Sequence, residues 1–288
     1  MANLERLERA AAAVAGAEDG GGLSAATREA LLAVLSATSA ARARAADEAD
    51  TAATGAALAT EEDWAISQFW YSEATARELA ALARGLAAEA AAEAAAAAAA
   101  SGGDGGGRAA VVACLSCPSV YKALRALLAE EAAAAAAAGP APPAARAPVR
   151  AHVLEFDRRF AIFGEDFSFF DYNTPLELPA ALLGACDVVV LDPPFLNRDC
   201  LAAFASSVAA LRRPAGGATR VVLCTGAVML RAARELLGAR PTRAEVRHES
   251  GRLSNPFSVF VDFPVSDAHP FLRGVDEEAE RAANASDT

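Results

Sequence analysis

The sequence is poor in aromatic residues and in basic charge. Aromatic residues make up 6% of its 288 residues, and 26 basic residues stand against 37 acidic ones, a formal net charge of −11. Because non-specific binding of DNA or RNA depends on neutralising phosphates, a chain this acidic is poorly suited to it, and a nucleic-acid partner is not expected. A basic protein surface would be a better-matched partner.

Cysteine is also scarce, and the patterns of an exported or membrane protein are missing. The five cysteines are an odd number, which favours reduced thiols over a disulfide framework. The first ten residues contain no apolar core of the secretory type, and no apolar run has the length and hydrophobicity of a membrane span. We therefore expect a soluble, cytoplasmic protein without a membrane partner, and we expect a monomer.

Several kinds of catalytic site find no support in the sequence. Cys114 and Cys117 form a C-x-x-C pair, but no second pair follows and the three histidines are not at ligand spacing. No Ser/His/Asp set and no Walker-type loop is present. We therefore expect no bound metal.

Changes in composition divide the chain into three parts. Residues 1–60 are dominated by small and charged residues and are predicted to form a helical, low-complexity extension. Residues 61–265 carry the aromatic clusters and the apolar runs, so they are predicted to be the folded domain. Residues 266–288 form a polar, acidic tail.

Within the central part, short apolar runs alternate with helical patterns. This alternation predicts an α/β fold with a doubly wound, mostly parallel sheet of seven strands, of the Rossmann-like kind. Such sheets bind ligands at the carboxyl ends of their strands, near the point where the strand order reverses. Helices are predicted over 73–100, capped by Ser72, and over 198–211. The predicted strands lie within 109–118, 149–157, 166–173, 186–195, 219–226, 244–250 and 255–263, with the last two forming a terminal hairpin.

The most informative motif is Asp192-Pro193-Pro194-Phe195, which directly follows a strongly apolar run. Two prolines cannot continue a central strand because they lack an N–H and fix φ, so they form a rigid turn with exposed carbonyls. Asp192 and the Pro193 carbonyl can accept hydrogen bonds from an amino group, while the Phe195 ring favours developing positive charge. The nitrogen lone pair can then be aimed at an electrophilic methyl group. The alternative is a turn that merely ends a strand.

Further motifs surround this one in a fixed order. Together they resemble the eukaryotic lysine methyltransferases that act on translation elongation factor 1-alpha. These are class I S-adenosylmethionine-dependent enzymes, once labelled N6-adenine DNA methyltransferases because of the same DPPF. The resemblance implies S-adenosylmethionine as cofactor, elongation factor 1-alpha as protein substrate, and residues 61–265 as the methyltransferase domain. The motifs are SQFWYS (67–72), CLSCPSVYKAL (114–124), LEFDRRF (154–160), FFDYNTPLELP (169–179), VVLDPPFL (189–196), VVLCTG (221–226) and RLSNPFSVFVDF (252–263).

The resemblance also implies which residues hold the cofactor. Asp157, at the end of the second strand, would bind the ribose hydroxyls, and Asp192 would border the methyl group. Where most class I methyltransferases have a glycine-rich loop after the first strand, this chain has none. The alternative for Asp157 is an ion pair with a neighbouring arginine, and for the residues after the third strand it is turn chemistry. The methionine part would lie against Ser116, Cys117, Pro118 and Ser119, and the adenine against Asp171, Tyr172 and Asn173.

A channel for the lysine side chain is implied by two further segments. Its residues would be Gln68, Phe69, Trp70 and Tyr71 on one wall and Asn255 and Phe257 on the other. For the first segment the alternative is an aromatic staple that pins the N-terminal helix to the core. For the second it is a plain turn.

Two other functions fit part of the pattern. DPPF suits the exocyclic amine of adenine equally well, so an N6-adenine methyltransferase acting on DNA or RNA is the first alternative, although base flipping calls for a basic groove. The second is a non-catalytic binding module with a decayed methyltransferase fold, which the absence of a glycine-rich loop suggests.

Overall fold

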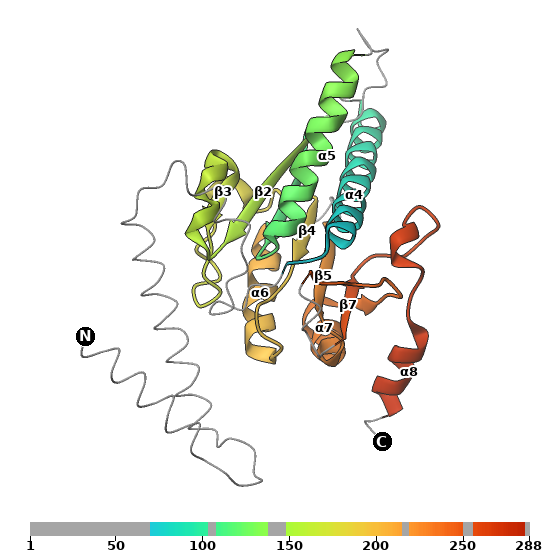
Figure 1. Ribbon diagram of the computed structural model, residues 1–288. Helices are drawn as coiled ribbons and strands as arrows, with labels where there is room; N and C mark the ends of the chain where they lie inside the picture. Colours follow the sequence, from blue (N-terminus) through green and yellow to red (C-terminus); the bar gives the residue numbers. More distant parts are fainter. Residues whose placement is uncertain (1–69, 103–107, 138–147, 215–218, 250–255, 286–288) are drawn as a thin grey trace, which may run out of the picture.

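The computed structural model describes residues 70–102, 108–137, 148–214, 219–249 and 256–285 (Figure 1). The predicted extension at 1–60 and the channel residues Gln68, Phe69 and Asn255 lie outside these residues. Among the described helices, none combines the length and apolar character needed to cross a membrane.

The centre of the molecule is a mixed sheet of seven strands in the order β3-β2-β1-β4-β5-β7-β6. All neighbouring pairs are parallel except those of β7, which runs antiparallel to β5 and to β6. The predicted fold class is confirmed. The strands are β1 (Ala110–Leu115), β2 (Val149–Glu155), β3 (Phe167–Phe169), β4 (Val188–Leu191), β5 (Arg220–Gly226), β6 (Arg240–Pro241) and β7 (Phe257–Val261).

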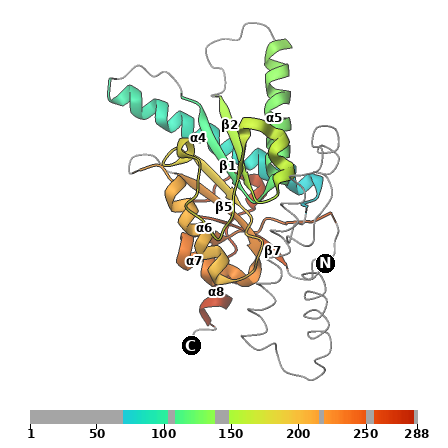
Figure 2. The ribbon, with the colours of Figure 1, turned by 90° about the vertical axis from the view of Figure 1, so that its left-hand side faces the viewer.

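Helices cover both faces of this sheet. In the sequence of β4, VVVL, every residue is buried, as expected for a strand covered on both sides. Alternate residues serve opposite faces: Val188 and Val190 pack with α4 (Glu73–Ala100) and α5 (Pro118–Ala137), and Val189 and Leu191 with α6 (Arg198–Leu211) and α7 (Leu230–Leu237). Figures 1 and 2 show α4 and α5 together on one face and α6 and α7 together on the other. The smaller helices are η2 (Arg158–Asp166), η3 (Ala180–Leu182), η4 (Ala227–Met229), η5 (Pro270–Leu272) and α8 (Glu277–Ala285).

Two helices begin at residues whose side chains cap them, and the Ser72 cap was predicted from the sequence. The Ser72 hydroxyl accepts a hydrogen bond from the Thr75 N–H at 3.3 Å, and α4 starts at the next residue, as predicted. The Asn197 side chain accepts one from the Cys200 N–H at 2.8 Å, and α6 spans the predicted 198–211. The α6 cap begins two residues after the DPPF motif, so it fixes where that motif leaves the sheet.

The register of the sheet brings three strand ends level. Leu115, the last residue of β1, lies opposite Leu154 of β2 and opposite Leu191, the last residue of β4. The next residues, Glu155 and Asp192 among them, therefore emerge at one edge, next to the point where the strand order reverses between β1 and β4. This is where a doubly wound sheet binds its ligand.

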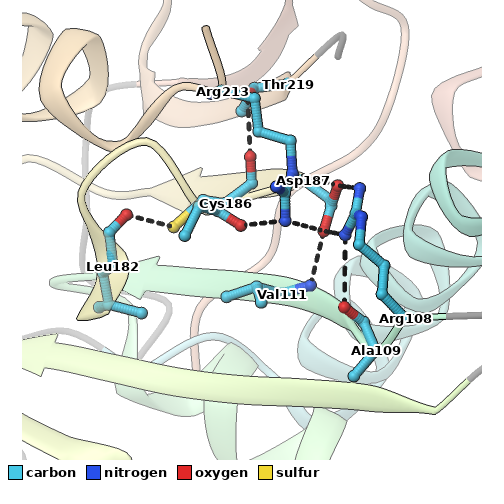
Figure 3. A network of polar contacts seen from close by, with 9 residues as sticks. Arg108, Ala109, Val111, Leu182, Cys186, Asp187, Arg213 and Thr219 are labelled. Carbon is cyan, nitrogen blue, oxygen red and sulfur yellow. Dashed lines mark hydrogen bonds and ion pairs between the residues drawn. The ribbon is translucent and has the colours of Figure 1, made fainter. Parts of the chain in front are cut away.

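At the opposite end of β4, Asp187 holds the sheet together through a buried network (Figure 3). Its side chain is 1% exposed. It accepts two hydrogen bonds from Arg108, at 2.6 and 2.7 Å, two from Arg213, at 2.7 and 3.2 Å, and one from the Val111 N–H at 2.8 Å. These bonds lower the pKa of Asp187 against the opposing effect of burial. The network ties the start of β4 to β1 and to the segment after α6.

The predicted terminal hairpin is wrong in its first strand. The strand that pairs with β7 is Arg240–Pro241, earlier than the predicted 244–250. Residues 247–249 instead form backbone hydrogen bonds with the segment before α4. The Ser72 N–H donates to the Arg247 carbonyl at 2.8 Å, and the Glu249 N–H donates to the Trp70 carbonyl at 2.9 Å. The alternating pattern of 244–250 favours a strand, but a pattern of this kind does not identify the partner segment, and among the described residues here only His248 forms a bridge.

Residues that follow β7 pack onto the same domain. Leu272, in η5, is fully buried in the core beside α4 and β7. Glu280 of α8 forms an ion pair with Arg240 of β6 at 2.8 Å. The boundary at residue 265 stays a prediction from composition.

Candidate functional site

The turn after β1 adopts a conformation that usually requires glycine. Ser116 has φ of +51°, in the left-handed region, and its N–H donates to the Leu154 carbonyl at 2.8 Å. Cys117 and Pro118 are buried, and the Cys117 thiol donates to the Val190 carbonyl at 3.3 Å. Because α5 begins at Pro118, its first turn, which includes Ser119, points its N-terminal end at the strand ends. The absence of glycine therefore leaves the backbone path of a cofactor loop intact.

Asp192 lies directly after β4, with its N–H donating to the Leu115 carbonyl at 3.1 Å. The Tyr71 hydroxyl donates to its Oδ2 at 2.5 Å. Burial raises the pKa of Asp192 to about 7, while this hydrogen bond opposes the rise. Within the described chain, no arginine or lysine forms an ion pair with this carboxylate. Asp192 is therefore a sheltered acid whose single side-chain donor among the described residues is a neutral hydroxyl.

Tyr71 is held from two directions. Its backbone forms an antiparallel bridge with His248, within the pairing of residues 70–72 with 247–249. The His248 ring lies 5.0 Å from the Tyr71 ring and 4.7 Å from that of Phe257, at the start of β7. The sequence indicates only that the histidines are not at ligand spacing, and no local signal connects position 248 with position 71. The structure thus connects Tyr71 and Phe257, both predicted channel residues, through the ring of His248.

The Trp70 side chain packs against η2 and α5. It is 6% exposed and packs edge-to-face on Phe160 of η2, with ring centroids 5.9 Å apart. The Lys122 amine lies 5.8 Å from the centre of its ring. These contacts are those of the aromatic staple that was weighed against the channel role.

A cavity of about 620 Å³ lies between α4 and α5. Trp70 and Tyr71 form part of its wall at one end, together with Ser119 and Lys122 of α5 and Glu249. It thus borders three of the residues that the sequence assigns to the site. Alanine side chains from both helices make much of the remaining lining apolar.

Glu155 is a site residue that sequence reasoning missed. It is the last residue of β2 and is 6% exposed. Its Oε1 accepts hydrogen bonds from the N–H groups of Phe156 and Asp157, at 2.9 and 3.1 Å. Burial, with smaller contributions from the charges of Asp157 and Asp192, raises its pKa to about 8 against the lowering effect of these two hydrogen bonds. The available signal was an acid inside the apolar run VLEF, because a buried strand accepts a carboxyl only where it has a task.

The carboxylate of the neighbouring Asp157 forms an ion pair with an arginine. Its carboxylate caps η2 by accepting the Arg159 N–H at 2.9 Å, and it pairs with the Arg159 guanidinium at 2.6 Å. This is the alternative considered for the residue. Between the two acids at the end of β2, Glu155 is the one that has no basic partner among the described residues.

The residues after β3 make a turn that brings one aromatic ring to the site. Asp171 Oδ1 accepts hydrogen bonds from the backbone and side-chain nitrogens of Asn173, at 2.9 and 2.8 Å, and Asn173 is exposed. The Tyr172 ring lies edge-to-face on Phe195 of the DPPF motif, with centroids 5.8 Å apart. Tyr172 therefore joins the ends of β3 and β4, while Asp171 and Asn173 shape the turn that carries it.

The prolines of the motif separate the acid from the ring. Pro193 is buried and Pro194 is half-buried, and Phe195 packs beside α6 and Tyr172. Leu196 follows and contacts Gly226, the last residue of β5, so closely that a Cβ at Gly226 would lie 2.8 Å from a Leu196 methyl group. The motif is therefore wedged between neighbouring strand ends.

These residues suit a ligand with a positive centre and hydroxyl groups. Glu155 and Asp192 are sheltered carboxyls without basic partners in the described chain, the Ser116 turn offers backbone close to them, and Tyr172 and Phe195 offer apolar ring surfaces. A sulfonium ion, a ribose diol and an adenine ring are the groups of S-adenosylmethionine, and each finds a matching partner type here. The side chains therefore fit the cofactor that the motifs imply.

Comparisons with known proteins agree with this geometry. A family model described as "Probable N6-adenine methyltransferase" matches residues 62–265. EEF1A lysine methyltransferase 1 of Homo sapiens is 37% identical over 204 residues, which cover 70% of this chain and 76% of the relative. A protein-lysine N-methyltransferase of Caenorhabditis elegans is 32% identical over 204 residues, covering 70% and 79%. One from Saccharomyces cerevisiae is 30% identical over 125 residues, covering 40% and 50%. The chain therefore belongs to the EEF1A lysine methyltransferase 1 family of protein-lysine N-methyltransferases.

Proposed function

We propose that this protein uses S-adenosylmethionine to methylate a lysine side chain of translation elongation factor 1-alpha. The observation that carries the proposal is the sheltered Asp192 carboxylate at the end of β4, held by Tyr71 and followed by the rigid Pro-Pro-Phe turn. The relatives' names supply the class of substrate. A cytoplasmic location is part of the same proposal.

The cofactor would be held by residues from three strand ends. Glu155 would accept hydrogen bonds from the ribose hydroxyls, in place of the predicted Asp157, whose carboxylate is engaged by Arg159. The turn from Ser116 to Ser119 would lie against the methionine part, and Tyr172 would flank the adenine. When bound, S-adenosylmethionine supplies the methyl group: the amine lone pair forms the new N–C bond, the S–C bond breaks, and its electron pair stays on sulfur as a thioether.

The amine would be positioned by the DPPF motif. Asp192 and the Pro193 carbonyl would accept its N–H bonds, and the Phe195 ring would favour the positive charge that develops on nitrogen. A lysine ammonium must lose a proton to water before its lone pair can react; desolvation favours that loss, whereas the charge of Asp192 opposes it. Positioning then contributes much of the rate, because the nitrogen and the methyl group are held in line.

The lysine would reach this point past aromatic walls. Tyr71 and Phe257 lie on either side of His248, and the cavity between α4 and α5 borders Tyr71. These contacts support the predicted channel, to which Gln68, Phe69 and Asn255 are also assigned by the family resemblance.

A lysine substrate is favoured over adenine by the net charge of the chain as well as by the names of its relatives. With a net charge of −11, the chain is ill matched to a polyphosphate substrate and well matched to a basic protein surface. A decayed, non-catalytic fold is disfavoured because an inactive site would have no need to keep two sheltered acids, Glu155 and Asp192, at the strand ends.

The test is transfer of a labelled methyl group from S-adenosylmethionine. Purified elongation factor 1-alpha and adenine-containing oligonucleotides are offered in parallel to the wild type and to Asp192→Ala. We expect label on the protein, at a lysine located by mass spectrometry, and a loss of at least a hundredfold in the variant. Label on the oligonucleotide alone would replace the proposal with the adenine activity, and label on neither would remove both.

A further inference from the structure

The hydrogen bond between Tyr71 and Asp192 joins two residues 121 positions apart at the centre of the site. Tyr71 precedes α4, whereas Asp192 ends a central strand. The Tyr71 hydroxyl contacts Oδ2, and within the described chain no other side chain donates a hydrogen bond to either oxygen. One carboxylate oxygen is therefore fixed by the protein, and Oδ1 is left for a ligand.

We propose that Tyr71 is the positioning residue of the reaction: its hydroxyl holds the Asp192 carboxylate in the one orientation that presents Oδ1 to the substrate amine. This inference rests on the proposed function for the identity of the amine. It assigns Tyr71 a role that differs from lining a channel, because the hydroxyl, more than the ring, carries it.

The surroundings of Tyr71 are built to keep that hydroxyl in place. The pairing of residues 70–72 with 247–249 fixes its backbone, and His248 fills the space between its ring and Phe257. The ring is 2% exposed, so the hydroxyl has no competing bulk water. A carboxyl that must aim at an amine benefits from this support, because a small error in angle or distance costs much of the rate.

The hydroxyl also sets the pH range in which Asp192 is ionised. Burial raises the pKa of Asp192 and the Tyr71 hydrogen bond lowers it, so removal of the hydroxyl raises it further. Among the described residues, the titratable groups facing Asp192 are Tyr71, Glu155 of β2, Cys117 before α5 and Cys224 of β5, and each has a raised pKa. Tyr71, Cys117 and Cys224 stay neutral near pH 7, whereas Glu155, with a pKa of about 8, titrates close to Asp192. His248, which packs on Tyr71, must be controlled separately.

The test compares Tyr71→Phe with Tyr121→Phe in the full-length chain. Tyr121 is a matched control, because it is also a buried tyrosine whose hydroxyl donates to an aspartate, Asp166, at 3.1 Å. A third variant, His248→Phe, keeps a flat ring beside Tyr71 and removes the imidazole titration. Thermal unfolding checks that each variant folds, and calorimetry checks that each binds S-adenosylmethionine.

The first readout needs no substrate. The carboxyl pKa of Asp192 is followed by carbon-13 NMR, with the signal assigned through Asp192→Asn. We expect it to rise in Tyr71→Phe and to stay at the wild-type value in Tyr121→Phe. An unchanged pKa in Tyr71→Phe would overturn the proposal, whatever the enzyme methylates.

The second readout is the pH profile of methyl transfer. In Tyr71→Phe, kcat at pH 7 should fall on the order of tenfold, with the affinity for S-adenosylmethionine unchanged, and the acid limb should move to higher pH. His248→Phe should keep the acid limb near its wild-type position. A uniform fall in kcat without movement of the limb would show a merely structural role. If the wild type transfers no methyl group to elongation factor 1-alpha, the proposed substrate fails while the NMR result still decides the role of Tyr71.

Discussion

The two aspartates that flank β4 lie five positions apart and have opposite environments. Asp187, before the strand, receives five hydrogen bonds, four of them from two arginines, and its pKa is lowered. Asp192, after the strand, receives one from a neutral hydroxyl, and its pKa is raised to about 7. Both sit at the end of the same apolar strand, so position in the sheet alone does not account for the difference.

The partners of each acid indicate its task. A sheltered carboxylate whose lone pairs are all engaged by cations is committed to its charged form and holds structure together. One left with spare accepting capacity is costly to the fold, and such groups concentrate at functional sites. The same contrast separates Asp157, paired with Arg159, from Glu155, which has no basic partner in the described chain.

The largest change in stability is expected at Asp187, the aspartate to which the comparison assigns a structural role. Asp187→Asn should lower the free energy of unfolding by about 3 kcal/mol, because it leaves two guanidinium groups beside a site that no longer balances them. The pKa of Asp187 is depressed in the folded state, so the wild-type advantage should persist at all pH values above about 4 and disappear as the pH falls below that. Urea unfolding at pH 8, 6 and 3 measures it.

The matched control is Asp199→Asn, which changes an exposed acid in the first turn of α6. It should alter stability by less than about 0.5 kcal/mol. A loss at Asp187 no greater than this would mean that the arginines around it do not depend on its charge.

A second effect, smaller in free energy, should separate the two acids at the end of β2. Measured at pH 9, above the Glu155 pKa of about 8, Glu155→Gln should weaken the binding of S-adenosylmethionine about tenfold, because the amide is a poorer acceptor for hydroxyl groups than a carboxylate. Asp157→Asn should lower thermal stability through the loss of its ion pair with Arg159, with cofactor affinity changed less than twofold. Isothermal calorimetry with the cofactor alone distinguishes them. If Asp157→Asn instead weakened cofactor binding more than Glu155→Gln, Asp157 would be the residue that binds the ribose.

The sequence was sufficient for features that depend on neighbouring residues. The buried run VVVL predicts a central strand, Ser72 predicts the start of a helix, and the two prolines after Asp192 mark the end of the strand. Each of these rests on backbone chemistry within a few residues, where local rules hold.

Contacts between distant segments could not be predicted from the sequence. Residues 244–250 have the alternation of a strand, yet β7 pairs with Arg240–Pro241 and the backbone near His248 pairs with residues 70–72. The hydrogen bond from Tyr71 to Asp192 depends on that unforeseen pairing. Likewise, the choice between Glu155 and Asp157 required knowing where the Arg159 side chain lies. An alternating pattern predicts that a segment will form backbone pairing, but tertiary packing determines which segment is its partner.

The smallest effect is the sharpest test of the comparison, because the same substitution should act with opposite sign at the two ends of β4. Asp192→Asn keeps an oxygen to accept the Tyr71 hydroxyl but removes a sheltered charge, so it should abolish activity and stabilise the fold at pH 8 by on the order of 1 kcal/mol. The folded-state pKa of Asp192 lies above its ordinary value of 3.8. Its contribution to stability is therefore complete below pH 4 and is lost as the pH rises through 7. The gain from asparagine should accordingly grow between pH 4 and 8, whereas Asp187→Asn destabilises throughout that range. If urea unfolding instead showed that Asp192→Asn lowers stability at pH 8, the charge at the end of β4 would be serving the fold, and the distinction drawn between the two aspartates would not hold.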